Sequence, residues 1–89
     1  MEELVLAIGD IIVGIDIGSS KVSLVVGEVN NFNQIELVYT VEHKCKGIKK
    51  TKIIDEDEIA NAIIKSIQDA EKEAEIKINS AYLTISPIA

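Results

Sequence analysis

The chain has 89 residues, of which 47% are hydrophobic, and a net charge of −6. That length predicts one domain with a modest core. The acidic balance argues against nucleic acid as a partner, since all nine basic residues are lysine and none is arginine. No run approaches the roughly 18 apolar residues of a membrane span, and the acidic start lacks the basic region of a signal peptide. We therefore expect a cytoplasmic chain that makes no membrane contact itself.

Residues 1–10 are interpreted as an N-terminal extension of a domain that begins at residue 11. Within the extension, residues 4–8 form a short apolar run that ends at the turn pair Gly9 and Asp10. The run fits an extra strand as well as a segment outside the sheet, and the residues leave both interpretations open.

Three strands joined by tight turns are predicted next. Residues 11–17 are apolar on both faces and rich in β-branched side chains, which indicates a central strand. Residues 21–29 also have two largely uncharged faces, so we expect this second strand to be well covered. Asparagines in residues 30–33 predict a turn. Alternating apolar and polar residues then predict an antiparallel third strand with one face nearer to water, and its apolar positions are Ile35, Leu37, Tyr39 and Val41.

A solvated loop and a helix are predicted to follow. Five lysines in residues 44–52 favour the loop, with a site for an acidic partner as the alternative. Asp55 is expected to be the N-cap of the helix and Glu58 to complete a capping box, and the helix should run to about Glu75. Its buried stripe is expected to comprise Ile59, Ile63, Ile67, Ala70 and Ala74, with Ala60 and Ala62 beside them.

Residues 81–85 predict a fourth strand, which Pro87 ends because proline cannot donate to a sheet ladder. A strand–helix–strand connection predicts that this strand lies parallel to the first one, on the side away from the other two. The fold class is therefore α/β, with the order β-β-β-α-β in a mixed sheet. Because one helix covers only one face of such a sheet, we expect either a fragment or a homo-oligomer whose second copy covers the open face.

One carboxylate in an otherwise aliphatic strand marks the candidate site. Asp16 stands near the end of the first strand, and a buried carboxylate without a partner is costly. In the turn that follows, Gly18 lets the backbone turn tightly and approach a ligand. Ser19 and Ser20 add hydroxyl groups, and Lys21 adds a positive charge. These residues predict a short anion-binding nest for a nucleotide phosphate, with Asp16 beside it to hold a hydrated metal ion.

Four segments resemble the FtsA family of bacterial cell-division actins, which belongs to the actin-like ATPase superfamily and has its ribonuclease-H-like fold. They are VGIDIGSSKV at 13–22, VGEV at 26–29, GIKK at 47–50 with IID at 53–55, and SAYLTIS at 80–86. The DIGSS turn alone is shared by many kinases and pilus proteins. The four segments together are more specific, and they extend along nearly all of the chain from residue 11.

The resemblance implies that the first hairpin is a phosphate loop for Mg·ATP. Asp16 would hold Mg²⁺ through water. Gly18, Ser19 and Ser20 would present N–H and hydroxyl groups to the β- and γ-phosphates. Lys21 would neutralise phosphate charge. The family also implies partners for the parent protein, namely further copies of itself in a polymer and the FtsZ ring, which it tethers to the cytoplasmic face of the cell membrane.

Large parts of the family's proteins have no counterpart in these 89 residues, namely the second phosphate loop, the adenosine-binding residues, the FtsZ-contacting subdomain and the membrane helix. We therefore expect residues 11–89 to be the first part of an actin-like ATPase subdomain, an N-terminal fragment. Such a fragment should bind ATP weakly and show no measurable hydrolysis, whether or not its parent is a weak ATPase.

Two other interpretations stay open. Another actin-fold ATPase, of the pilus-assembly, chaperone or sugar-kinase kind, would share the DIGSS turn but differ in residues 47–55. A small self-associating structural module would bind no nucleotide, and Asp16 would then be only a strand-end turn former.

Overall fold

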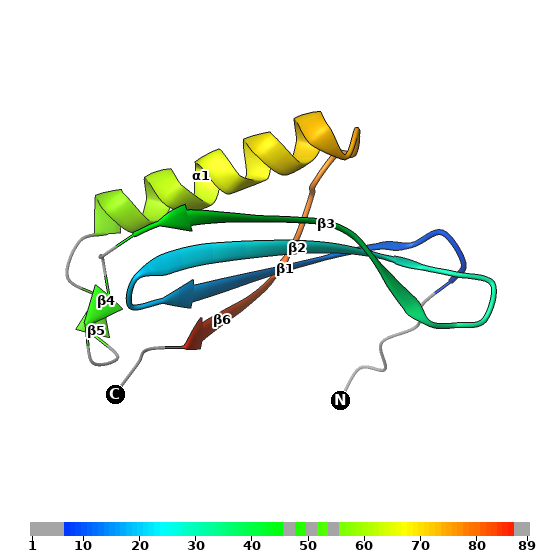
Figure 1. Ribbon diagram of the computed structural model, residues 1–89, viewed down its shortest axis with the longest axis horizontal. Helices are drawn as coiled ribbons and strands as arrows, with labels where there is room; N and C mark the ends of the chain where they lie inside the picture. Colours follow the sequence, from blue (N-terminus) through cyan, green and yellow to red (C-terminus); the bar gives the residue numbers. More distant parts are fainter. Residues whose placement is uncertain (1–6, 46–47, 50–51, 54–55, 87–89) are drawn as a thin grey trace.

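The computed structural model describes residues 7–45, 48–49, 52–53 and 56–86. These residues form two layers, a four-stranded sheet and one helix that lies across one of its faces (Figure 1). The elements are β1 (Ile11–Gly18), β2 (Lys21–Val29), β3 (Ile35–Lys44), β4 (Ile48–Lys49), β5 (Lys52–Ile53), α1 (Glu56–Glu73) and β6 (Tyr82–Ser86).

The order of strands in the main sheet is β3-β2-β1-β6. β1 pairs antiparallel with β2 and parallel with β6, and β2 pairs antiparallel with β3. The predicted central position of the first strand and the parallel fourth strand beside it are confirmed. The predicted mixed α/β sheet with one helix is confirmed.

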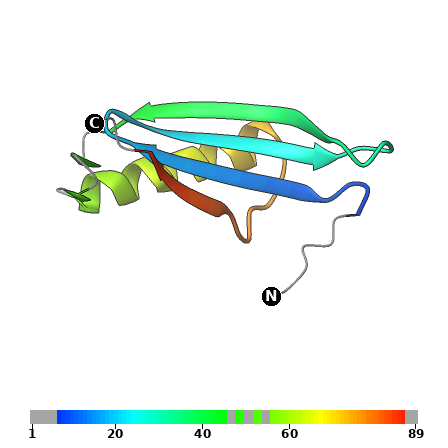
Figure 2. The same cartoon turned by 90° about the horizontal axis from the view of Figure 1, so that it is seen from below.

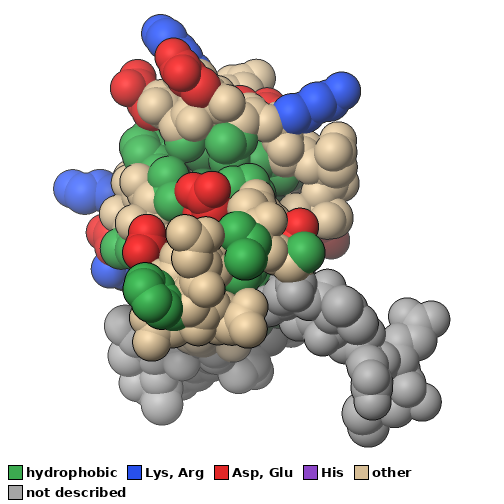
Figure 3. All heavy atoms as spheres, turned by 90° about the vertical axis from the view of Figure 1, so that its right-hand side faces the viewer, with side chains coloured by type: hydrophobic (Ala, Val, Ile, Leu, Met, Phe, Trp, Pro, Cys, Tyr) green, Lys and Arg blue, Asp and Glu red, His purple; other side chains and the backbone are tan. Residues whose placement is uncertain are grey.

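The core lies between the sheet and α1. Alternate residues of the two central strands point toward the helix and are at most 4% exposed; they are Val13, Ile15 and Ile17 from β1 and Val22, Leu24 and Val26 from β2. From the end of the molecule shown in Figure 3, hydrophobic side chains lie between the helix at the top and the sheet beneath it. Burial of each such side chain contributes roughly 1.5–3 kcal/mol, so this layer holds α1 on the sheet.

The inner face of α1 carries small and branched side chains. Four of them are buried: Ile59, Ala62, Ser66 and Ala70. Ile63 and Ile67, which were predicted to be buried, are partly buried and pack against the core. Ala60 is exposed, so the predicted stripe was wrong there. The stripe also omitted Ser66, whose hydroxyl donates to the Ala62 carbonyl at 2.8 Å. This bond within the helix satisfies the buried hydroxyl and lets a serine occupy an apolar stripe.

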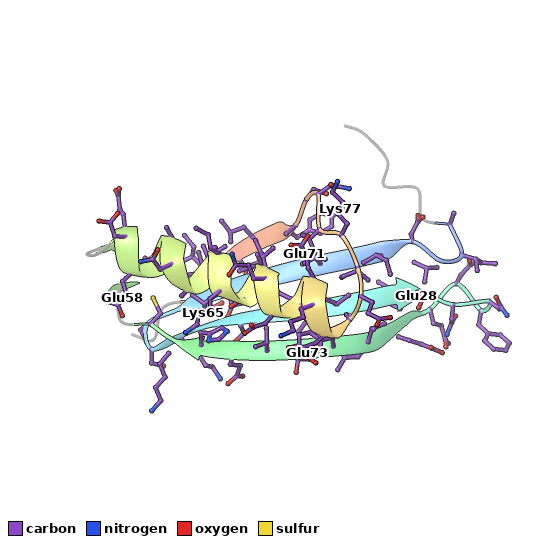
Figure 4. The ribbon with its side chains drawn as sticks, turned by 90° about the horizontal axis from the view of Figure 1, so that it is seen from above. Glu28, Glu58, Lys65, Glu71, Glu73 and Lys77 are labelled. Atoms are coloured by element: carbon purple, nitrogen blue, oxygen red, sulfur yellow. The ribbon has the colours of Figure 1, made fainter. Side chains whose placement is uncertain are left out.

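The helix ends at a residue in the left-handed region. Glu75 has a φ of 54°, and the Ile76 N–H donates to the Glu71 carbonyl at 3.2 Å, which is the outer bond of a Schellman cap. The Glu71 side chain reaches beyond the helix as well, because its Oε2 accepts the Ile78 N–H at 2.9 Å (Figure 4). The regular helix therefore stops at Glu73, two residues before the predicted end.

β3 contains one residue more than its partner strand. The ladder pairs Tyr39 with Val26 but Leu37 with Gly27, so Val38 is the extra residue of a bulge. Because side chains alternate along a strand, this one-residue shift places Leu37 on the opposite face from Tyr39. The prediction that Ile35 and Leu37 share a face with Tyr39 and Val41 was therefore wrong.

The sheet face opposite α1 has no cover from the described residues (Figure 2). The prediction that both faces of the second strand are covered was wrong, because the one helix packs on the other face. Val25 in the middle of β2 is 43% exposed as a result. Large apolar side chains are exposed on this face, which we call the open face: Val25, Ile35, Leu37 and Tyr82.

Outside the main sheet, β4 and β5 pair antiparallel over two residues each, where the sequence predicts only a solvated loop. Residues 7–10 form a turn around Gly9, which has a φ of 89°. The predicted N-cap Asp55, the strand-ending Pro87 and most of the apolar run at 4–8 lie outside the described residues. In the described part of the chain, no helix combines the length and apolarity that crossing a membrane requires.

Candidate functional site

Asp16 lies on the open face of the sheet, two residues before the end of β1. Its neighbours Ile15 and Ile17 point into the core, so strand alternation turns the carboxylate away from α1. Its Oδ1 accepts two hydrogen bonds from β6, one from Thr84 Oγ1 at 2.6 Å and one from Ser86 Oγ at 2.7 Å. The carboxylate is therefore not packed among apolar side chains, and Oδ2 takes part in neither bond.

The two hydroxyl groups favour the charged form of Asp16. The hydrogen bonds from Thr84 and Ser86 lower the pKa of its carboxyl below the ordinary value of 3.8, and the positive charge of Lys21 lowers the pKa slightly further, while partial desolvation opposes them. Hydrogen bonds to a carboxylate favour its charged form. Asp16 is thus an anion at neutral pH and is able to attract a cation.

The turn between β1 and β2 consists of Ser19 and Ser20, flanked by Gly18 and Lys21. Gly18 does not have a positive φ, so the prediction that it serves to turn the backbone was wrong. A Cβ on Gly18 would lie 3.4 Å from the Lys21 carbonyl oxygen and 3.6 Å from that of Ser86, which is ordinary contact. Within the described chain, neither the turn nor the packing requires glycine at this position, so the bare backbone remains free for the approach of a ligand.

One carbonyl group of the turn is bonded to the end of β3. The Cys45 N–H donates to the Ser20 carbonyl at 2.9 Å, and Cys45 itself is buried beside the core. This bond joins the end of β3 to the tip of the hairpin. It fixes the turn without using the N–H groups that an anion would need.

Lys21 and Glu42 form an ion pair at the same end of the sheet. Lys21 Nζ lies 3.0 Å from Glu42 Oε1, and the two side chains are 52% and 58% exposed. Exposed pairs of this kind contribute little stability, so the ammonium group can turn to a stronger anion. Lys44 pairs with Lys21 in the ladder. Ser20, Lys21, Glu42 and Lys44 line a hollow of about 500 Å³ beside the turn.

The structure thus brings the predicted residues together at one end of the open face and adds others that the sequence patterns did not predict. The additions are Thr84, Ser86, Glu42 and Lys44. A signal for two of them was present, because residues 82, 84 and 86 alternate with leucine and isoleucine and so share one face of the fourth strand. Their contact with Asp16 spans 68 and 70 residues, which no local pattern reveals.

The donor set at Asp16 fits a magnesium ion that keeps most of its water. Among the described residues, no group of three or more His, Cys, Asp and Glu side chains could hold a metal ion. A single carboxylate beside hydroxyl groups suits a hard cation, and Mg²⁺ is commonly bound by one or two carboxylates with water and substrate phosphates completing its shell. The residues present therefore fit a hydrated Mg²⁺ that arrives with a phosphate ligand.

Comparison with known proteins shows which family this chain resembles. It is 37% identical over 78 residues to the cell division protein FtsA of Pseudomonas aeruginosa, and 40% identical over 76 residues to that of the Buchnera aphidicola strain from Acyrthosiphon pisum. FtsA of Escherichia coli K12 is 29% identical over 76 residues. The resemblance to FtsA is confirmed.

These alignments cover 85–88% of the chain but only 18–19% of each FtsA protein. The chain thus spans about a fifth of the length of the curated relatives that it matches. No family model matches the chain. Among solved structures, the crystal structure of the Aquifex aeolicus member of the Ppx/GppA family aligns over 86% of this chain and 35% of that one, with a TM-score of 0.47 and 12% identity.

Proposed function

We propose that this FtsA-like chain binds the phosphates of Mg·ATP at the β1–β2 turn. The observation that carries the proposal is the ionised carboxylate of Asp16 at the same end of the open face as a serine turn and Lys21. A carboxylate close to the N–H and hydroxyl groups of a serine turn and to an ammonium group is the combination needed to bind a phosphate together with its metal ion.

Each residue of the site has a separate task in this proposal. Asp16 binds water molecules of the Mg²⁺ shell through its carboxylate. Ser19 and Ser20 offer N–H and hydroxyl donors to phosphate oxygens, and Gly18 lets those oxygens approach the backbone. Lys21 leaves Glu42 and balances phosphate charge. Bound Mg²⁺ would neutralise and orient the phosphates, and we propose no hydrolytic step within these 89 residues.

For the parent protein we propose the part in bacterial cell division that its relatives' name indicates. In this proposal the parent polymerises and links the FtsZ ring to the cytoplasmic face of the cell membrane. The similarity to FtsA at 29–40% identity over most of the chain supports this choice over another actin-fold ATPase.

Calorimetric titration of the chain with Mg·ATP tests the proposal. Wild-type protein should bind weakly and lose most of its affinity when EDTA removes the metal ion. The isosteric Asp16→Asn variant should lose this metal dependence, whereas Glu28→Gln, an exposed change at the far end of β2, should behave as wild type. Equal titrations for the wild type and Asp16→Asn would leave the phosphate site without support.

Self-association through the open face is a second candidate, supported by its apolar surface. Ile12, Gly14, Val25, Gly27, Ile35, Leu37 and Tyr82 line a hollow of about 400 Å³ there. A second copy would remove this surface from water, which favours association. Sedimentation equilibrium should then show a dimer that Leu37→Lys dissociates, and a wild type that is monomeric at all concentrations would contradict it.

A further inference from the structure

Two hydroxyl groups of β6 meet the carboxylate of Asp16 on a single oxygen. Thr84 is the ladder partner of Asp16 in the parallel pair, and Ser86 is the partner of Gly18. Both side chains therefore leave the same face of β6 toward Asp16 Oδ1, at 2.6 and 2.7 Å. Neither residue belongs to the turn that the proposed function uses to bind phosphate.

We infer that Thr84 and Ser86 are positioning residues for the proposed nucleotide site, which hold Asp16 by Oδ1 in one orientation and leave Oδ2 to the hydrated metal ion. The inference rests on the proposed function and extends it to β6. In this inference β6 orients the carboxylate of Asp16, although β6 makes none of the proposed phosphate contacts.

The environment of Asp16 explains why positioning is needed. The carboxylate stands on the open face, which α1 does not cover (Figure 2). A hydroxyl-to-carboxylate bond of this length is charge-assisted and stronger than a neutral one. Two such bonds to one oxygen determine both the side-chain rotamer and the rotation of the carboxylate plane.

The source of the hydroxyl groups makes the arrangement rigid. Thr84 and Ser86 are fixed by the parallel ladder with β1, in which Asp16 and Gly18 are their partners. Supporting groups on regular strands hold a ligand more accurately than groups on loops. The bound orientation of Asp16 is thus built into the sheet before any ligand arrives.

A purely structural role is the competing explanation. All five residues of β6 are exposed, so the two bonds could serve only to attach an edge strand. That role predicts a loss of stability on removal of the hydroxyl groups, with no change in how nucleotide binding depends on metal. The positioning role predicts a change in metal dependence that a conservative hydroxyl-bearing variant restores.

The test compares the 89-residue chain with the double variant Thr84→Val/Ser86→Ala, which removes both hydroxyl groups. Thr84→Ser and Ser86→Thr keep a hydroxyl group at each position, and Tyr82→Phe changes the same face of β6 without touching Asp16. Affinity for ATP is measured with Mg²⁺ and with EDTA, and urea unfolding of each variant reports its stability. Broadening of the Asp16 and Thr84 amide signals by Mn²⁺·ATP provides a spectroscopic measure of metal placement.

We expect the double variant to lose about 10- to 100-fold in Mg·ATP affinity, the usual effect of removing groups that orient a metal ligand, with little change in EDTA. Its Mn²⁺-dependent broadening at Asp16 should weaken, and the hydroxyl-keeping variants should match wild type. If the double variant unfolds, the single variants Thr84→Val and Ser86→Ala replace it, each expected to lose a part of the metal dependence.

Two failures are distinguishable. Wild-type metal dependence in the double variant, together with its loss in Asp16→Asn, would overturn the positioning role and leave the proposed function standing. Absence of metal-dependent binding in the wild type, or its persistence in Asp16→Asn, would overturn the proposed function and the inference with it.

Discussion

Asp16 and Thr84 are direct partners in the parallel ladder between β1 and β6, and the Thr84 hydroxyl donates to Asp16 Oδ1 across 2.6 Å. The strands β2 to β5 and the helix α1 lie between them in the sequence. The candidate site is therefore complete only when the first and last strands of the described chain are paired, which couples its formation to folding of the whole sheet.

The pH dependence of stability should follow from this pairing. Ionised Asp16 is favoured in the folded chain, because its pKa lies below the ordinary value of 3.8. The resulting stabilisation is present above the unfolded pKa and is lost as the pH falls through the folded pKa.

Thr84→Val/Ser86→Ala should raise the pKa of Asp16 and reduce this acid-dependent part of the unfolding free energy. Carbon-13 NMR titration of the carboxyl group, with Thr40→Val on exposed β3 as control, measures the shift. A double variant with an unchanged Asp16 titration would contradict the hydrogen-bond assignment.

Replacing Glu75 by glycine should stabilise the chain. Glu75 has a φ of 54°, and a non-glycine residue in the left-handed region is disfavoured by roughly 1 kcal/mol. Glu75→Gly removes this strain and keeps the cap that Ile76 makes with Glu71. Urea unfolding should show a gain of about 0.5–1 kcal/mol. In the matched control Glu73→Gly, at the last residue of α1, glycine should instead destabilise by up to about 1 kcal/mol. Two losses of equal size would mean that the Glu75 conformation carries no strain.

Gly18→Ala separates ligand approach from folding. The added methyl group meets only ordinary contacts in the chain, so the free energy of unfolding should change by less than about 0.5 kcal/mol. If phosphate binds as proposed, the affinity for Mg·ATP should nevertheless fall, because the added Cβ would stand where the phosphate oxygens approach the backbone. Gly14→Ala is the control, since it adds a methyl group to the same strand, against Val25 at 3.3 Å. Equal Mg·ATP affinities for wild type and Gly18→Ala would show that no ligand approaches this backbone closely.

Local patterns in the sequence predicted the fold well, because strand and helix periodicity, turn residues and the parallel crossover are encoded within short stretches. The β-bulge at Val38 was missed because one extra residue leaves the apolar alternation of Ile35 to Val41 unbroken in the sequence. The exposure of Val25 was missed because it is not a local property. Its burial depends on whether another element covers the open face, and the residues of β2 do not determine that.

The sequence predicted only the part of the candidate site whose residues are adjacent in the chain. Asp16 and the turn after it are adjacent in the sequence, so their residue types were informative together. Thr84 and Ser86 are polar positions on an ordinary alternating strand, and only the register of β6 against β1 brings them to Asp16. The role of Gly18 was misjudged because residue type does not reveal φ, and here the backbone turns without a left-handed residue.

Tyr39 should titrate at higher pH than a free tyrosine. Its pKa is raised by partial desolvation and further by the negative charges of Asp69 and Glu73 on α1. The neutral phenol is therefore favoured in the folded chain, and this stabilisation is present below the unfolded pKa of 10.0 and lost as the pH rises through the folded one. Asp69→Asn should lower the pKa of Tyr39, measured by tyrosinate absorbance in a Tyr82→Phe background.

The control for this experiment is Glu71→Gln, because Glu71 lies on the same helix but does not contribute to the shift at Tyr39. Asp69 also contacts His43, with Nε2 2.8 Å from Oδ2, so the same variant replaces the carboxylate in a contact between α1 and β3. Urea unfolding of both variants separates that loss from the electrostatic effect. Matching Tyr39 titrations in the two variants would exclude Asp69 as a source of the raised pKa.

Binding of Mg·ATP should slow amide hydrogen exchange in β6. The strand is exposed along its length and pairs with β1 alone among the described residues, so local opening should give its amides low protection. Pairing of β6 with β1 supplies Thr84 and Ser86, which orient Asp16 for the ligand. Because coupling is reciprocal, binding of the ligand should in turn favour the paired state of β6. Exchange at residues 82–86 should slow with Mg·ATP in the wild type but not in Asp16→Asn. Residues 35–37 of β3, at the opposite edge of the sheet, serve as the internal reference, and equal slowing there would indicate general stabilisation of the fold rather than coupling through Asp16.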